Sequence, residues 1–206
     1  MFVRDRMTPN PPVVSKAMPL LEVFRLMREG NYEDLPVVEG DQIVGLITLW
    51  NISGALCFDT VAAGKRVVAD AILPVVVTVY EDDVIEEAAF KMQKFKLSTL
   101  PVVNREDTLV GLIDDSDLFG VFVDMLGLKA PGTRVTLEAE DKVGVLAGIA
   151  EIVRSTGVNI ASVATFDAGP GQRTIVLRLK TIEAKGVVDS LWQAGYRVTH
   201  VTQVWE

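Results

Sequence analysis

The sequence predicts an α/β (α+β) protein in which two β-α-β-β-α repeats precede a ferredoxin-like β-α-β-β-α-β domain. One observation predicts the repeats: Leu35–Val38 and Val44–Ile47 recur as Leu100–Val103 and Val110–Ile113. A second observation predicts the last domain. After residue 130 this repeat no longer matches, and alternating apolar segments flank segments with helical spacing.

The offset between the two copies changes in only one place, and that place is a turn. Glu39-Gly40-Asp41 in the first copy becomes the longer Asn104-Arg105-Glu106-Asp107 in the second. Because loops absorb insertions and strands do not, this indicates duplication of a folded unit. The predicted domains are residues 1–64, 65–130 and 131–206. Two copies make a paired module and not a solenoid.

The first copy begins with an extended segment at Val13–Val14 and a helix near Pro19, a residue that suits an early helical position. One face of this helix carries the apolar residues Leu20, Val23, Phe24 and Met27. Strands are predicted at Leu35–Val38 and Ile43–Ile47, and a closing helix begins near Thr48.

The second copy has the same order after a linker at 58–66. Val75–Val79 is extended, and Asp83 with Glu86 resembles a capping pair for the next helix. The apolar face of that helix is Val84, Ala88, Met92 and Phe95. The remaining elements are strands at Leu100–Val103 and Leu109–Ile113 and a helix from Asp114 to Gly127.

A turn at Leu128–Gly132 marks the start of the third domain. Its predicted strands are Arg134–Ala139, Asn159–Phe166, Arg173–Lys180 and Tyr196–Trp205, and its predicted helices are Val143–Ser155 and Ala184–Ala194. This order is that of a split β-α-β fold.

Composition excludes several classes of function. The net charge of −8 argues against a nucleic-acid partner, because binding to the phosphate backbone needs a basic face. No apolar run approaches the roughly 20 residues of a membrane helix. The charged start Met1–Arg6 does not resemble a signal peptide. We therefore expect a cytoplasmic protein that has neither a membrane nor a nucleic acid as partner.

The sequence offers no constellation for catalysis. Cys57 is the only cysteine and is expected to be buried and inert. His200, the only histidine, falls in a predicted strand, with no nucleophile motif to pair with it. Gly169-Pro170-Gly171 leads into a strand and is not a dinucleotide loop. Asp114, Asp115 and Asp117 are expected to belong to a helix start and not to a magnesium site.

These motifs carry a resemblance to known families. Val3–Pro9, Leu35–Val38 and Val44–Asn51 resemble a CBS domain, and residues 67–126 resemble a second one. Asp141–Leu146 and Gly157–Ile160 resemble an ACT domain. The order over the whole chain resembles the acetoin-utilization accessory proteins of the AcuB type.

The resemblance implies a regulator and not an enzyme. It would bind an adenosyl small molecule (AMP, ATP, adenosine or S-adenosylmethionine), would require no cofactor, and would tune an unknown protein partner. It implies a homodimer. Two alternatives stay open: a scaffold protein with vestigial clefts, and an enzyme acting on acetoin or its precursors.

In the CBS pattern a hydroxyl residue contacts phosphate or ribose, and an Asp three residues later holds the ribose diol. The first copy has Thr48 and Asn51 at these positions, and the second has Asp114 and Asp117. A carboxylate at position 114 would repel a phosphate. The second cleft is thus expected to prefer a ligand without an anionic 5′ end. The basic residues Arg4, Arg6, Arg66 and Arg105 could offset this repulsion.

The resemblance also implies residues that contact adenine through backbone and apolar groups. One cleft would use Val13, Val14 and Pro36, and the other Val76, Val77, Leu97, Ser98, Thr99 and Pro101. Pro36 and Pro101 have a structural alternative, since each can start a strand where no N–H is required.

In the third domain the resemblance implies an amino-acid site. Asp141, Gly144, Val145 and Leu146 occupy a strand-to-helix turn whose N–H groups can hold a carboxylate, with Asn159 and Ile160 on a facing strand. Lys142 and Val143 depart from the common Arg-Pro pair. The alternative is a domain that only dimerises.

Overall fold

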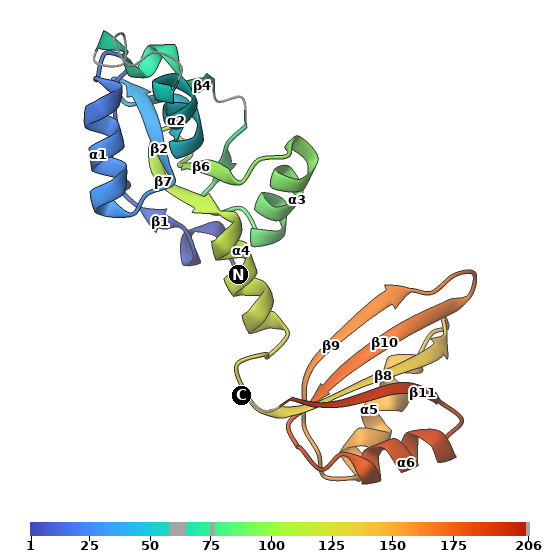
Figure 1. Ribbon diagram of the computed structural model, residues 1–206. Coiled ribbons are helices and arrows are strands. Elements are labelled where there is room, and N and C mark those ends of the chain that lie inside the picture. The colour runs from blue at the N-terminus through green and yellow to red at the C-terminus, as the bar shows by residue number, and fades with distance from the viewer. Residues whose placement is uncertain (58–64, 75–76, 205–206) are drawn as a thin grey trace. The chain divides into compact units, whose positions relative to one another are not determined.

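The computed structural model describes residues 1–57, 65–74 and 77–204. The chain divides into two compact units, Met1–Phe119 and Gly120–Glu206 (Figure 1). The side chain of Cys57 and the whole of Val76 lie outside the described residues, so the two predictions made for them stay predictions.

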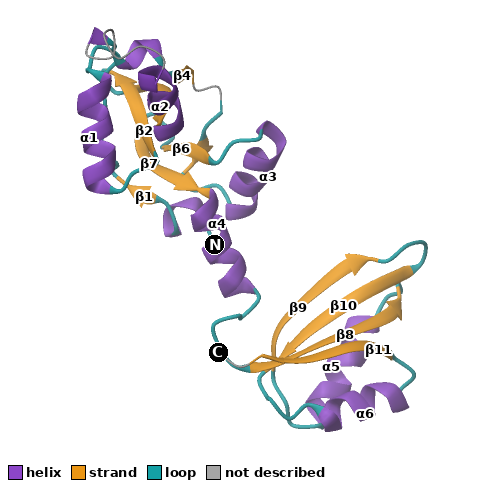
Figure 2. Cartoon of the chain, in the orientation of Figure 1, coloured by secondary structure: helices purple, strands orange, loops and turns teal. Residues whose placement is uncertain are grey.

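The first unit contains the elements of both repeats (Figure 2). They are η1 (Val3–Asp5), β1 (Thr8–Pro9), α1 (Leu20–Gly30), β2 (Asp34–Glu39), β3 (Gln42–Thr48), α2 (Leu49–Cys57), η3 (Val68–Asp70), β4 (Leu73–Pro74), β5 (Val79–Tyr80), α3 (Ile85–Phe95), β6 (Thr99–Val103), β7 (Leu109–Asp114) and α4 (Asp115–Met125). The first repeat has the predicted order β-α-β-β-α, and the second has the same order with one more short strand, β5, before its first helix. Helix α4 continues into the second unit.

The two repeats exchange their first strands. One sheet has the order β1-β7-β6-β5 and the other β2-β3-β4. Pro9 of the first repeat is paired with Gly111 of the second, and Pro74 of the second with Gly45 of the first. Each central hairpin is therefore completed by a strand from the other repeat.

The 3₁₀ helices η1 and η3 extend this exchange. The N–H of Val3 donates to the carbonyl of Asp83 at 2.9 Å, and the N–H of Val68 donates to the carbonyl of Met18 at 2.9 Å. Asp5 and Asp70 each accept a hydrogen bond from the backbone three residues before them. These bonds explain why Val-x-Asp occurs in both copies: the Val is buried and the Asp holds the turn.

One predicted cap is wrong. Helix α3 begins at Ile85 with Val84 as its N-cap residue and no side-chain cap. The Asp83 carboxylate accepts a hydrogen bond from the N–H of Tyr80 at 3.1 Å and lies 3.8 Å from Lys91 Nζ. The N–H of Ile85 instead donates to the carbonyl of Met1, so the exchanged N-terminal segment serves this end of the helix.

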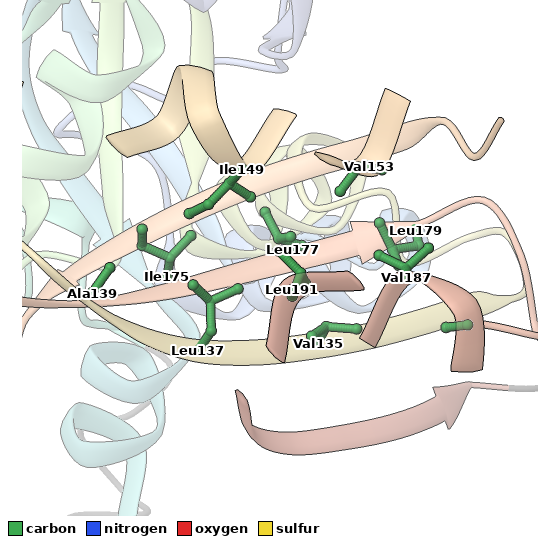
Figure 3. Close-up of a cluster of buried hydrophobic side chains, with 11 residues drawn as sticks. Val135, Leu137, Ala139, Ile149, Val153, Ile175, Leu177, Leu179, Val187 and Leu191 are labelled. Atoms are coloured by element: carbon green, nitrogen blue, oxygen red, sulfur yellow. The ribbon is translucent and has the colours of Figure 1, made fainter. Parts of the chain in front are cut away.

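The second unit has the predicted ferredoxin-like fold. Its elements are β8 (Gly132–Glu140), α5 (Val145–Ser155), β9 (Ile160–Asp167), β10 (Gln172–Leu179), α6 (Lys185–Gln193) and β11 (Arg197–Val204). The sheet order is β11-β8-β10-β9, with antiparallel neighbours. Val135 and Leu137 of β8 and Ile175 and Leu177 of β10 pack against both helices, and Leu191 of α6 is fully buried among them (Figure 3).

We expect Gly45→Ala to lower the free energy of unfolding by about 1–3 kcal/mol, the usual cost of overpacking. An added Cβ would lie 2.7 Å from the carbonyl oxygen of Leu73 in the exchanged strand and 2.3 Å from Ile72 Cδ1. Gly111→Ala should cost less, because the nearest backbone atom there, the Thr8 carbonyl oxygen, would lie at 3.0 Å and the closer Met7 side chain is flexible. Chemical denaturation measures both.

The matched control is Gly54→Ala in helix α2, where nothing lies within 4 Å of an added Cβ. This change should raise stability by up to about 1 kcal/mol through helix propensity. If Gly45→Ala were as stable as the unmodified protein, the close crossing of β4 over β3 would be contradicted.

Candidate functional site

The first unit contains a cavity of about 390 Å³ whose walls come from both repeats. The N-terminal segment supplies Thr8 and Pro11, the first repeat supplies 31–34, and the second supplies Ser98, Thr99, Leu112 and 114–116. Its volume falls within the usual range for small-molecule sites. The exchanged strand β1 thus brings part of the wall to a cavity that no single repeat could form.

Two residues at equivalent positions of the repeats meet in this wall. Asp34 and Thr99 are 65 residues apart and begin β2 and β6, and the Thr99 hydroxyl donates a hydrogen bond to the Asp34 carboxylate. Thr99 is only 6% exposed. A buried hydroxyl needs a partner, and here the partner comes from the other repeat.

The Asp34 carboxyl has a pKa raised above its ordinary value. Burial is the main cause, and the nearby carboxylates of Glu33, Asp114 and Asp115 add to it. The hydrogen bond from Thr99 acts in the opposite direction, because it stabilises the charged form. The other three carboxylates that line the cavity are therefore close enough to Asp34 to disfavour its charged form.

The two predicted ribose and phosphate motifs form helix caps. In the first repeat the N–H of Asn51 donates to Thr48 Oγ1 at 3.0 Å, and that hydroxyl donates to Asn51 Oδ1. In the second repeat the N–H of Asp117 donates to Asp114 Oδ1 at 2.9 Å, and the N–H of Asp114 donates to Asp117 Oδ2 at 3.1 Å. The second arrangement is a capping box made by two aspartates.

Asp117 has a raised pKa, and burial is again the main cause. The hydrogen bond that it accepts from the Asp114 backbone lowers the pKa. Its carboxylate is therefore already partnered inside the helix start. This geometry supports the capping interpretation of Asp114 and Asp117, and it leaves their proposed contact with a ligand as a further role.

The cavity brings together Ser98, Thr99 and Asp114 of the predicted nucleotide-binding residues. The residues that are described but do not line it are Val13, Val14, Pro36, Thr48, Asn51, Val77, Leu97, Pro101 and Asp117. Val14 points into the core, and its N–H donates to the carbonyl of Pro36 at 3.0 Å. The wall residues that sequence reasoning missed are Thr8, Pro11, 31–34, Leu112, Asp115 and Ser116. The match between Thr8-Pro9 and Leu73-Pro74 is the sequence feature from which the exchanged strands β1 and β4 could have been predicted.

The second unit has a cleft of about 470 Å³ at the start of α5. It is lined by the predicted Asp141, Gly144, Val145 and Leu146 and by residues not predicted, such as Thr165 and Arg173. Arg173 Nε lies 3.1 Å from Asp141 Oδ1. Gly144 has a φ of +89°, a conformation that favours glycine and explains this residue at the turn.

Asn159 and Ile160 do not reach this cleft within one chain. They lie at the start of β9, where Ile160 pairs with Leu179, while the cleft contacts β9 at Thr165, which pairs with Ile175. Five residues of extended strand separate the two points by roughly 17 Å. The N–H of Lys180 donates to the carbonyl of Asn159 at 2.9 Å, so this end of β9 is anchored in its own sheet.

Among the described residues, no group of three or more His, Cys, Asp or Glu side chains has the arrangement of a metal site. Within the same part of the chain, no helix is long and apolar enough to cross a membrane. His200 lies on β11 with its Nε2 atom 2.6 Å from the Thr202 hydroxyl.

Comparison with protein-family models gives two matches. A CBS domain model matches residues 3–57 and 68–124, and a TTHA0829-like ACT domain model matches residues 131–202.

The solved structures similar to the chain include CBS-domain pairs that cover about three fifths of it. The CBS domain pair of protein MJ0100, in complex with 5′-methylthioadenosine and S-adenosyl-L-methionine, is 27% identical with a TM-score of 0.53, over 59% of this chain and 95% of the other. CBSX2 in complex with AMP is 25% identical with a TM-score of 0.52, over 59% and 96%. A putative acetoin utilization protein (AcuB) from Vibrio cholerae is 27% identical with a TM-score of 0.54, over 63% and 95%.

Curated relatives include an L-aspartate semialdehyde sulfurtransferase of Methanocaldococcus jannaschii, 29% identical over 59% of this chain, and a homoserine O-acetyltransferase of Methanosphaerula palustris, 33% identical over 57%. The match covers only 23% of the length of each of these two proteins. Their catalytic activities therefore do not transfer to this chain.

We expect Asp34→Asn to raise the free energy of unfolding at neutral pH. A carboxyl whose pKa is raised by folding contributes fully to stability below its ordinary pKa of about 3.9. That contribution is lost as the pH rises through the folded value. The amide removes this loss and keeps an oxygen that can accept the Thr99 hydrogen bond.

Denaturation from about pH 3 to pH 7 measures the effect, since the gain should be absent at the acidic end. Asp41→Asn, in the exposed turn between β2 and β3, controls for the change in net charge. A gain that did not change with pH would contradict the raised pKa of Asp34.

Proposed function

The chain belongs to the CBS domain family and carries a C-terminal ACT domain, and from this premise we propose that it is a ligand-sensing regulator and not an enzyme. The ligand is an adenosyl compound, held in the cavity of the first unit. No cofactor is required for this role. The observation that carries the proposal is the cavity lined by both repeats and by the exchanged strand.

A ligand in this cavity would contact three segments that are distant in sequence. Thr8 belongs to the exchanged strand, Asp34 begins the central hairpin of the first repeat, and Asp114 precedes helix α4 of the second. Binding would therefore favour the arrangement of the repeats that holds all three in contact. The size of that shift is limited by the difference in affinity of the ligand for the alternative arrangements.

The solved relatives support an adenosyl ligand. The paired CBS domains of MJ0100 hold 5′-methylthioadenosine and S-adenosyl-L-methionine, and CBSX2 holds AMP. These ligands share adenosine and differ in the charge at its 5′ end. The likeness to the putative acetoin utilization protein (AcuB) from Vibrio cholerae supports acetoin utilization as the process in which this chain takes part.

We further propose that two copies associate. Trp50 of α2 is 86% exposed and Phe119 of α4 is 69% exposed, on helices at equivalent positions of the repeats. Phe122 and Met125, three and six residues after Phe119 on α4, are also exposed, at 57% and 58%. A group of exposed large apolar side chains on one helix is typical of a surface that contacts another chain. A second copy is the occupant that the paired architecture favours.

Dimerisation would also complete a site in the ACT domain. Strand β9 is at the edge of its sheet, so it can pair with β9 of a second copy. Antiparallel pairing about a twofold axis would place the partner subunit's Asn159 beside the Asp167 end of this chain, next to Arg173 and the cleft at Gly144. An amino acid bound there would contact both subunits.

We expect adenosyl ligands to raise the melting temperature. Saturation at 100 times Kd contributes about 2.7 kcal/mol, or roughly 5–11 °C for a domain of this size. Ser98→Trp should abolish the shift. Ser98 is an exposed residue that lines the cavity, so the much larger indole would occupy the space of the ligand. A thermal-shift panel with AMP, ATP, adenosine and S-adenosylmethionine is the measurement.

Ser155→Trp, on an exposed position of α5 in the other unit, is the size-matched control and should keep the shift. No shift with any of the four compounds would support a scaffold with empty clefts instead. An equal shift in Ser98→Trp would place the ligand elsewhere.

For the dimer, light scattering at tens of micromolar should give twice the mass of the chain. Trp50→Glu combined with Phe119→Glu should give the monomer mass, because two charges would replace the exposed apolar contact. Phe90→Glu, at an exposed aromatic position on α3, is the control. A monomeric unmodified protein would refute the proposal.

A further inference from the structure

The charge of the cavity in the first unit has one sign. Four carboxylate side chains line it, those of Glu33, Asp34, Asp114 and Asp115. Among the lining residues that the structure describes, none is Lys, Arg or His. Two of the carboxylates come from each repeat, so this charge does not follow from the motif of a single copy.

The start of helix α4 does not compensate for this charge. Its dipole amounts to about half a positive charge. The backbone donors that would hold a phosphate there are largely in use: the N–H of Asp115 donates to the carbonyl of Ser98 at 2.9 Å, and the N–H of Asp117 donates to Asp114 Oδ1 at 2.9 Å. A phosphate at this helix start would meet the Asp114 carboxylate and few free amides.

None of the four arginines that could have offset the carboxylates, Arg4, Arg6, Arg66 and Arg105, lines the cavity, although the positive charge of Arg6 lowers the pKa of Asp117 at this helix start. Arg105 is held by Asp82 at 2.8 Å and lies over the Tyr80 ring. Arg4 lies over the Phe2 ring, with 4.6 Å between the guanidinium carbon and the ring centroid. Both guanidinium groups are therefore engaged in contacts outside the cavity wall.

We propose that this cavity selects adenosyl ligands with a positively charged 5′ substituent, such as a sulfonium, over those with a 5′ phosphate. The inference rests on the proposed function, which places an adenosyl ligand in the cavity on its geometry and on the solved relatives. The relatives hold ligands of both kinds, and the carboxylates from both repeats decide between them.

A matched pair of ligands tests the charge. S-adenosylmethionine and S-adenosylhomocysteine differ by one methyl group and by the positive charge on sulfur. Calorimetry should give tighter binding of the methylated compound, by about 3- to 30-fold for one charge near these carboxylates after screening. Adenosine should bind more tightly than AMP, because the phosphate is repelled.

Asp114→Thr isolates the contribution of one carboxylate while keeping the helix cap, since Thr48 caps the equivalent helix of the first repeat. It should remove part of this preference for the sulfonium, about 2- to 5-fold for one of the four carboxylates, and should improve the binding of AMP relative to adenosine. Asp41→Asn, at the opposite end of the hairpin and roughly 20 Å from Asp34, should change neither ratio.

Three outcomes are distinguishable. A preference for the sulfonium that falls in Asp114→Thr and not in Asp41→Asn supports the inference. Binding of adenosyl compounds with equal affinity for both members of the pair overturns the inference and leaves the proposed function standing. Failure of all four compounds to bind overturns the proposed function itself.

Discussion

The exchange of first strands between the two repeats is the constraint on which the first unit depends. Pro9 pairs with Gly111 and Pro74 with Gly45, and both glycines lie where the incoming chain leaves no room for a side chain. The same exchange carries Thr8 into the cavity wall. Fold and site are therefore set by one feature, the crossing of each N-terminal segment to the other repeat.

Within this nearly symmetric frame, the cavity is built by unlike residues at equivalent positions. Asp34 and Thr99 meet as acceptor and donor, whereas two aspartates there would repel one another. Thr48 and Asp114 cap equivalent helices, the first with a hydroxyl and the second with a carboxylate. The asymmetry is thus small in shape and large in electrostatics, which is the property that would let one module distinguish adenosyl ligands by charge.

Sequence reasoning located the repeats, the β-α-β-β-α order and the ACT-type fold, because these depend on local periodicity and on turns such as Gly40. It could not locate the cavity wall at 31–34, since those residues reach the cavity only through long-range packing. It also assigned Asp83 to the cap of helix α3, whereas the first N–H of that helix, that of Ile85, donates to the Met1 carbonyl. In the second unit Asp141 and Asn159 were grouped by motif, whereas strand length separates them within one chain.

The crossing of the first strands has a consequence for the origin of the protein. A single ancestral repeat would have lacked the edge strand of its own hairpin, and it could have completed its sheet only by swapping that strand with an identical chain. In such a dimer the two identical chains would have the same residue at the position of Asp34 and at the position of Thr99. A contact between two different residues there could not have existed in it. In a single chain that carries both repeats each half can differ from the other, and the Asp34–Thr99 contact in the cavity wall is such a difference.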